Sequence, residues 1–299
     1  MKIARNQFRL VSFLALCFLM SIPLQAQDGM KIYAVLCGQT DVFDIGKGCE
    51  VSVSKMTDFL EVVSHETEIP VEYVYLTGEN YSKDNILSTL DQLDLENPDS
   101  SIIFFYATSH GFNYKDTPTR FAFLGAHPNR KNLTAREFNE FGMSLELDVH
   151  RRLMSKSARL TITIGEACNN VIDMDVPDRY QAMNLNRPHR LRELFRESIG
   201  DIISTSSKLD QFSWTDSKDG GIWTNQFLRS FDEITSSSEY AEWQEIFDRA
   251  RNYTVGVAEA EAQVTQEPDD YIDIISTPMQ LIDESQKKRK QQPKAVIKN

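Results

Sequence analysis

The reactive ends of two apolar runs constrain the fold of this chain more than any other feature. Residues 160–164 alternate aliphatic side chains with threonine, which is the period-two pattern of a β-strand, and Gly165 interrupts the pattern before Glu-Ala-Cys. Residues 101–108, SIIFFYAT, form a second such run, which ends in Ser-His-Gly. Open α/β sheets usually place their chemistry at the carboxyl ends of parallel strands. Two neighbouring strands of this kind would bring Cys168 and His110 together.

Each of these features is weak on its own. A single cysteine is more often a small buried hydrophobe than a nucleophile, and a His-Gly pair is more often part of a loop. Their conjunction is more specific, because both residues follow an apolar strand and Glu166 puts a charge where an ordinary core strand has none. A thiol with a histidine beside it is the pair that nucleophilic catalysis needs.

Strand and helix patterns alternate along the rest of the chain, which predicts an α/β fold with a largely parallel sheet and helices on both faces. Strand patterns occupy residues 32–37, 71–76, 102–107, 160–164, 201–204 and 271–275, with a short strand or hairpin at 121–124. Helical patterns occupy residues 51–63, 82–93, 134–141, 222–231 and 241–260. Residues 169–198 are polar, and we expect a surface loop that flows into a helix near Leu191.

The first 26 residues have the order of an export signal. Basic residues come first, an apolar core at residues 10–20 is too short to span a bilayer, and Leu24-Gln25-Ala26 offers small-residue cleavage before Gln27. We therefore expect an exported protein, periplasmic or secreted, without stable membrane insertion after signal removal. Residues 27–285 are long enough for one large domain, and residues 286–299, QKKRKQQPKAVIKN, have the composition of a disordered basic tail.

The net charge disfavours a nucleic-acid-binding site, and the spacing of the histidines disfavours a metal site. Loss of the signal would remove three basic residues and leave 29 against 44 acidic ones, a formal charge of −15, which disfavours nucleic acid as a partner. The five histidines are scattered and have no zinc-site spacing with cysteine, so no metal site is expected. The oligomeric state has no signature in this sequence.

Three cysteines remain after signal removal, an odd number for an oxidising compartment, so at least one thiol is expected to be free. Cys37 ends the first strand pattern and Cys49 precedes the helical pattern at 51–63. A bridge between these two is conceivable, although two buried thiols are the favoured alternative. Cys168 is then the free thiol.

The order of strand, HG, spacer, strand and E-A-C resembles the caspase-like cysteine peptidases, the group that holds caspases, metacaspases, legumains, clostripains and gingipains. Four further stretches support the resemblance. KIYAVLCG at 31–38 resembles the first strand, GCEVSVSKMTDFL at 48–60 the first helix of metacaspase-type members, and STSSKLDQFSW at 204–214 with GGIWTNQFL at 220–228 the elements that wall the specificity pocket. The resemblance covers about residues 31–228 and implies a caspase-like α/β/α sandwich.

The resemblance implies a cysteine endopeptidase domain over residues 27–285. Cys168 would attack the carbonyl carbon of a peptide or protein substrate, and His110 would protonate the departing amine. The backbone N–H groups of Gly111 and Cys168 would hold the oxyanion. This chemistry needs no metal and no cofactor. In the caspase group, the position of residues 169–198 often carries an exposed linker that is cut during activation; an ordinary surface loop is the equal alternative.

Substrate preference is expected to depend on Glu166, two residues before the nucleophile. This position corresponds to a pocket residue that is Gln in caspases, Asp in metacaspases and Glu in legumains, and an acidic side chain there favours a basic P1 residue, Arg or Lys, with Asn as the competitor. Ser206 and Asp210 are expected to line the same pocket. Metacaspase-type members carry an Asp where this chain has Ser52, so one expected carboxylate is missing.

Two alternatives to an exported endopeptidase stay open. One is a catalytically silent caspase-like module that binds a partner, and the other is an unrelated cysteine-dependent hydrolase or transferase on an α/β scaffold. A silent module has no chemical need for both His110 and Cys168, so their joint presence favours the enzyme.

Overall fold

The computed structural model describes residues 29–113, 120–129, 137, 140–168, 188–209, 211–237, 241–262 and 265–275, and of Cys168 it describes the backbone. Its centre is a sheet with the strand order β10-β7-β6-β3-β1-β2, in which only β10 runs antiparallel to its neighbour. The strands are β1 (Lys31–Gly38), β2 (Val71–Thr77), β3 (Ser101–Phe112), β6 (Leu160–Cys168), β7 (Ile199–Thr205) and β10 (Asp269–Ile275).

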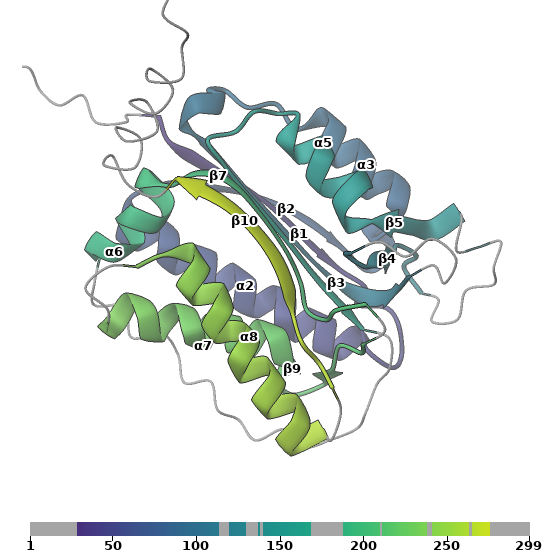
Figure 1. Ribbon diagram of the computed structural model, residues 1–299. Coiled ribbons are helices and arrows are strands. Elements are labelled where there is room, and N and C mark those ends of the chain that lie inside the picture. The colour runs from purple at the N-terminus through teal and green to yellow at the C-terminus, as the bar shows by residue number, and fades with distance from the viewer. Residues whose placement is uncertain are drawn as a thin grey trace, which may run out of the picture.

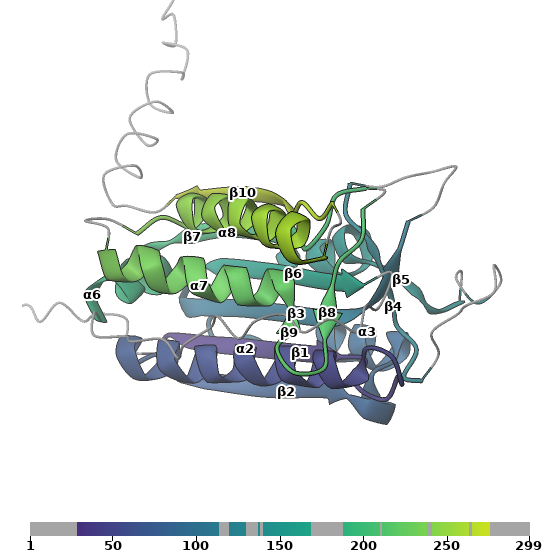
Figure 2. The ribbon, with the colours of Figure 1, turned by 90° about the horizontal axis from the view of Figure 1, so that it is seen from below.

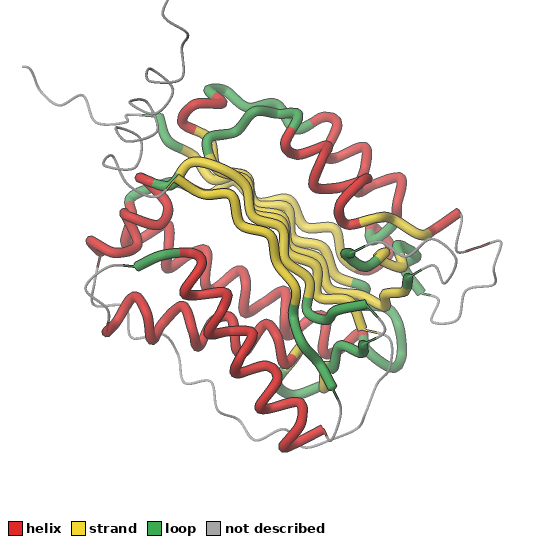
Figure 3. Tube along the Cα trace, in the orientation of Figure 1, coloured by secondary structure: helices red, strands yellow, loops and turns green. Residues whose placement is uncertain are grey.

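Helices cover both faces of this sheet, as Figures 1 and 2 show. One face carries α2 (Gly46–Thr67), α6 (Pro188–Arg192), α7 (Ile222–Ser237) and α8 (Trp243–Val257), and the other carries α3 (Lys83–Gln92) and α5 (Arg151–Met154). The trace in Figure 3 shows the strands as one twisted layer between the two helical layers. The predicted α/β/α sandwich with a mostly parallel central sheet is confirmed.

Shorter elements complete the described part of the chain. β4 (Phe123–Gly125) and β5 (Gly142–Ser144) extend the end of β3 as an antiparallel flap, and β8 (Thr215–Asp216) pairs with β9 (Gly220–Gly221). Short helical turns are η1 (Gly78–Asn80), η2 (Pro98–Ser100), η3 (Leu145–His150), η4 (Glu193–Glu197) and η5 (Ala258–Ala262). No helix within the described residues is long and apolar enough to cross a membrane.

Burial on both faces explains why the central strands have continuous apolar runs. Along β3, Phe104 and Tyr106 belong to the core beneath α2, α7 and α8, whereas Phe105 and Ala107 belong to the core beneath α3 and α5. The first core is rich in aromatic rings; the ring of Phe59 on α2 meets a ring of α7, that of Phe231, edge-on with centroids 4.9 Å apart.

Several predicted boundaries move for identifiable reasons. α2 begins at Gly46, ahead of the predicted residue 51, because the loop before it is anchored by a small buried cluster of Val42, Ile45 and Cys49. α3 begins after Ser82, as predicted, and the Ser82 hydroxyl accepts the Asn85 N–H at 3.3 Å. The predicted short strand at 121–124 is β4. The predicted helix at 134–141 and the loop at 169–187 lie largely or wholly outside the described residues.

Gly165 does not end its strand, contrary to the expectation from sequence. β6 continues through Gly165 to Cys168, and a Cβ there would lie 2.7 Å from a methyl group of Leu145, so a larger residue would require the Leu145 side chain to shift. The sequence pattern did not reveal η3 or α5, which pack on β6 through Leu145, Val149 and Leu153.

Both remaining described cysteines are buried thiols, which confirms the favoured alternative for Cys37 and Cys49. Burial raises the pKa of both thiols, that of Cys49 to about 12. A buried thiol that stays protonated at neutral pH is a poor nucleophile.

His150 should make the fold sensitive to acid. It is 4 % exposed, its Nδ1 lies 2.9 Å from the Thr163 hydroxyl, and burial lowers its pKa to about 4. The unfolded chain takes up this proton below about pH 6.5, but the folded chain does so only near pH 4, so acidification through this interval favours unfolding. Between pH 7 and pH 4.5, the unfolding free energy of wild type should fall by up to about 3 kcal/mol more than that of His150→Asn.

Urea unfolding at pH 7 and pH 4.5 measures this difference. The matched control is His65→Asn, which removes an imidazole from an exposed position on α2. Equal losses of stability on acidification in wild type and His150→Asn would contradict the assignment.

Candidate active site

The β3–β6 register brings the two chemistry-bearing residues level. The pairing runs without a break from Ile102 opposite Leu160 to His110 opposite Cys168. Both strands are parallel, so these residues share the carboxyl edge of the sheet. The sequence-predicted neighbours therefore lie on adjacent strands at the last paired position.

Side chains of the loop after β1 hold His110 from two directions. The imidazole Nε2 of His110 lies 3.1 Å from Oδ1 of Asp44, and the His110 main-chain N–H donates to Oε1 of Gln39 at 3.0 Å. Gln39 in turn donates to the carbonyl of His127 at 2.6 Å. The side chains of His110 and Asp44 are only 11 % and 12 % exposed. The ring is therefore fixed in a mostly buried position.

Gly111 follows His110 at a point where no side chain fits. Its main chain pairs with Leu124 of β4, and a Cβ would lie 2.3 Å from that of Ala167. The glycine thus lets β3 pass close to β6 immediately beside the dyad positions. Its expected role as an oxyanion donor together with the Cys168 N–H stays a prediction.

Glu166 lies beneath this surface, with no exposed area. Its Oε2 accepts hydrogen bonds from the hydroxyls of Tyr106 at 2.8 Å and Thr224 at 2.7 Å, and its Oε1 accepts the Thr224 N–H at 3.2 Å. Thr224 is in the first turn of α7, so a carboxylate from the sheet satisfies a donor at the start of this helix. Burial raises the pKa of Glu166, and the hydrogen bonds from Thr224 and Tyr106 oppose that rise.

Two small residues shape the cover over Glu166. A Cβ on Gly221 would lie 1.7 Å from Oε1 of Glu166, so only glycine leaves room for the carboxylate. The hydroxyl of Ser52 accepts the Gly221 N–H at 2.9 Å, and Ser52 is itself fully buried. Ser52, at the position of the missing carboxylate, therefore supports the segment that closes over Glu166.

Ser206 and Asp210 were also predicted to line the specificity pocket. Ser206 is fully buried, and its hydroxyl accepts the Ala167 N–H at 3.3 Å. It joins the end of β7 to β6 and does not line an open surface in this structure. Asp210 lies outside the described residues.

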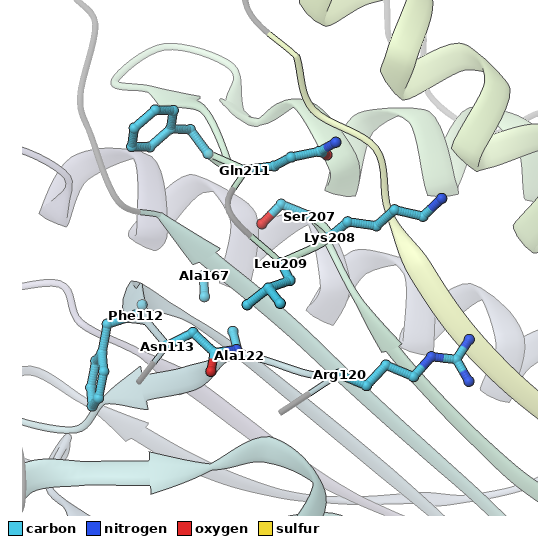
Figure 4. Close-up of a pocket in the computed structure, with 11 residues that line it drawn as sticks. Phe112, Asn113, Arg120, Ala122, Ala167, Ser207, Lys208, Leu209 and Gln211 are labelled. Atoms are coloured by element: carbon cyan, nitrogen blue, oxygen red, sulfur yellow. The ribbon is translucent and has the colours of Figure 1, made fainter. Parts of the chain in front are cut away.

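A cavity of about 350 Å³ opens beside Gly111 and Ala167, on the opposite side of β6 from Glu166. Figure 4 shows Arg120 and Lys208 extending toward the same end of this cavity, with Phe112 at the other end. Arg120 bonds both carboxylate oxygens of Asp269, and Lys208 pairs with Glu267 at 2.6 Å. Both cations thus have acidic partners. The rest of the lining is Gly111, Asn113, Ala122, Ala167, Ser207, Leu209, Gln211 and Phe212.

The loop that forms one wall of the cavity is held by the segment before β10. Gln266, which is fully buried, donates to the carbonyl of Ser206 at 3.1 Å and accepts the Trp214 N–H at 3.1 Å, so one side chain bridges both ends of the loop. Glu267 adds a main-chain contact to each of Lys208 and Gln211.

Sequence reasoning did not identify Asp44, Gln39 or Gln266. Asp44 lies in a loop without periodicity, and Gln266 lies nearly a hundred residues after Cys168, so neither has a local pattern that points to the site. Within the described residues, no group of three or more His, Cys, Asp or Glu side chains could hold a metal ion.

Comparisons with known proteins agree with this geometry. A family model described as Caspase domain matches residues 32–295. The crystal structure of caspase-1 from Spodoptera frugiperda is similar with a TM-score of 0.50 and 10 % identity, over 82 % of this chain and 86 % of that chain; at this identity the likeness supports the fold alone. No curated protein matches the chain at a significant level. The family match spans most of the sequence, and the chain therefore belongs to the caspase family and carries a cysteine peptidase domain of that family.

Proposed function

We propose that this protein is an exported cysteine endopeptidase in which Cys168 is the nucleophile and His110 the acid and base. The observation that carries the proposal is the level pairing of His110 with Cys168 at the carboxyl edge of the sheet. The two other described thiols are buried and stay protonated, which leaves Cys168 as the thiol suited to attack.

The reaction would follow the usual course of thiol acyl transfer. The Cys168 thiolate adds to the carbonyl carbon, and the oxyanion is held by the N–H groups of Gly111 and Cys168. His110 then gives its proton to the leaving amine, and water hydrolyses the resulting thioester. The absence of a side chain at Gly111 lets β3 pass close to Ala167, which keeps the Gly111 main chain next to the position of Cys168.

The cavity beside the dyad positions supports an extended peptide as substrate. Its basic residues already have acidic partners, so the binding surface that remains is largely apolar. Leu209 and Phe212 are 41 % and 42 % exposed at its edge. We expect an apolar substrate side chain near the scissile bond to fill it.

For the P1 residue we propose a preference for Arg or Lys, with Asn as the competitor. The Glu166 carboxyl supports this preference, because a guanidinium or ammonium group bound against it would favour its ionised form. Because Glu166 is covered, contact requires the Gly221 segment to move and the Thr224 and Tyr106 hydrogen bonds to be exchanged for donors of the substrate. Caspase-like cleavage after Asp is disfavoured, since an aspartate would meet a like charge.

Cys168→Ala and His110→Ala should each lower peptide hydrolysis by about a thousandfold or more, since each removes one half of the reacting pair. Cys37→Ala and Cys49→Ala should affect stability more than turnover, because both thiols are buried. Cys37→Ala is the matched control, since Cys49 also packs against the loop that carries Asp44. Fluorogenic peptides measure turnover, and an acyloxymethyl ketone with Arg or Asn at P1 should label Cys168.

Turnover that survives in Cys168→Ala would mean that another thiol, or another chemistry, is at work. A well-folded wild type that is neither labelled nor active on any peptide would favour the silent binding module instead.

Glu166→Gln tests the pocket. Wild type should cleave after Arg or Lys in preference to Asn and Asp, and the variant should lose about ten- to a hundredfold of that selectivity, the value of a charge-assisted hydrogen bond. Glutamine keeps an acceptor for the Thr224 N–H, so α7 should stay capped. Glu50→Gln removes an equal charge from an exposed site and controls for long-range attraction, which salt screens. An unchanged Arg-to-Asn ratio, or a wild-type preference for Asn or Asp, would refute the role of Glu166.

Export predicts a mature protein that begins near Gln27. Expression in a host with a functional secretion pathway, followed by intact-mass measurement, should show the loss of residues 1–26. Retention of their mass in the exported protein would refute the cleavage, and confinement to the cytoplasm would refute export.

A further inference from the structure

We propose that Asp44 is a positioning residue that holds His110 protonated at Nε2, so that Nδ1 is the nitrogen that exchanges a proton with Cys168. This inference rests on the proposed cysteine chemistry and adds a third residue to it. A carboxylate can only accept a hydrogen bond, so the 3.1 Å contact between Nε2 and Oδ1 requires the ring proton on Nε2. Of the two ring nitrogens, this leaves Nδ1 for the reaction.

Burial makes the contact effective. Both side chains are only about one-tenth exposed, and a charge pair in such a position is screened far less than one in water. The carboxylate therefore fixes both the tautomer and the orientation of the ring. With the ring proton held on Nε2, Nδ1 can accept the proton of Cys168, so loss of the carboxylate should slow formation of the thiolate.

The loop that carries Asp44 is anchored on both sides. Val42 and Ile45, which lie two residues before and one residue after Asp44, are 5 % and 1 % exposed and pack with Cys49 of α2. The main chain is also tied down, because the Gly46 N–H donates to the Val42 carbonyl at 2.7 Å. The carboxylate is thus held in place before substrate arrives, as a positioning group must be.

The surroundings of the pair include other ionisable groups. Cys49 on α2 stays protonated, because its pKa is raised by burial and further by the charges of Glu166 and Asp44. Glu166 and Cys168 are on β6, and Asp41 shares the loop of Asp44. Gln39 and Gly125, which contact the main chain of His110, are neutral.

The proton balance of the reaction is then complete. The Cys168 proton moves to Nδ1, the sulfur bonds to the carbonyl carbon, and the Nδ1 proton passes to the amine as the C–N bond breaks. In the second half, Nδ1 takes a proton from water as the water oxygen attacks the thioester, and returns it to sulfur as the C–S bond breaks. Nε2 keeps its proton on Asp44 throughout.

The test measures the thiolate directly and does not depend on peptidase activity. Iodoacetamide alkylation of Cys168 is followed between pH 5 and pH 9 by mass spectrometry of its proteolytic peptide, in wild type, Asp44→Asn, Asp41→Asn and His110→Ala. Asp41→Asn is the matched control, since it removes the same charge from the same loop. Melting temperatures of all variants check the fold.

At pH 6 the alkylation rate should fall about tenfold or more in Asp44→Asn and stay within about twofold of wild type in Asp41→Asn. His110→Ala should give the pH curve of an ordinary thiol. Where peptides are cleaved, the pH profile of kcat/KM should change in Asp44→Asn and keep its wild-type form in Asp41→Asn.

Superimposable curves for Asp44→Asn and Asp41→Asn would overturn the proposal, as would a wild-type curve that does not depend on His110. A tenfold loss in Asp44→Asn without any peptide cleavage by wild type would support Asp44 and refute the peptidase, so the two failures are distinguishable.

Discussion

The hydrogen-bonded register between β3 and β6 is the constraint on which the site depends. Side chains alternate between the two faces of a sheet, so a slip of one residue would move every side chain of β6 to the other face. The aliphatic residues of β6, Leu160, Ile162 and Ile164, belong to the aromatic core, and its threonines lie on the other face, so apolar burial opposes such a slip. Polar and steric contacts specify the register further: the Glu166 carboxylate meets Tyr106 and Thr224 on one face, and Gly111 leaves space for Ala167. The level position of His110 and Cys168 is therefore a consequence of contacts made by their neighbours.

Glu166 links β6, the strand that carries Cys168, to the first turn of α7. A buried carboxylate is costly unless donors surround it, and here hydroxyl and main-chain donors do so. Ser52 is neutral at the adjoining position, where an aspartate would place a second negative charge and disfavour ionisation of both. A neutral serine at position 52, in place of an acid, is thus compatible with a single buried carboxylate, that of Glu166, which supports α7. Any use of Glu166 in recognition must compete with this internal role.

Periodicity and chain order predicted the sheet, the principal helices and the meeting of His110 with Cys168, because burial on two faces gives long apolar runs and the resemblance fixes their order. They could not predict that Gly165 lies within a strand, since the Leu145 side chain that packs against it comes from a segment without a clear pattern. Asp44 was equally hidden, because its partner His110 is 66 residues away and the short loop that carries Asp44 has no period. Glu166 and Ser206 were expected to line an open pocket because of their positions in the sequence. In the structure both are buried, Glu166 beneath Gly221 and Ser206 beside Gln266, and sequence spacing does not reveal these contacts.

The side chain of Gln266 bridges both ends of the loop that forms one wall of the cavity, and it belongs to the segment that leads into the last strand of the sheet. A ribosome therefore makes Cys168 about 100 residues before it makes the part that fixes this wall. During synthesis, the nascent chain already contains Cys168, His110 and most of the strands of the sheet before Gln266 is present to hold the cavity wall. The order of synthesis thus delays completion of this cavity wall until the C-terminal part has docked.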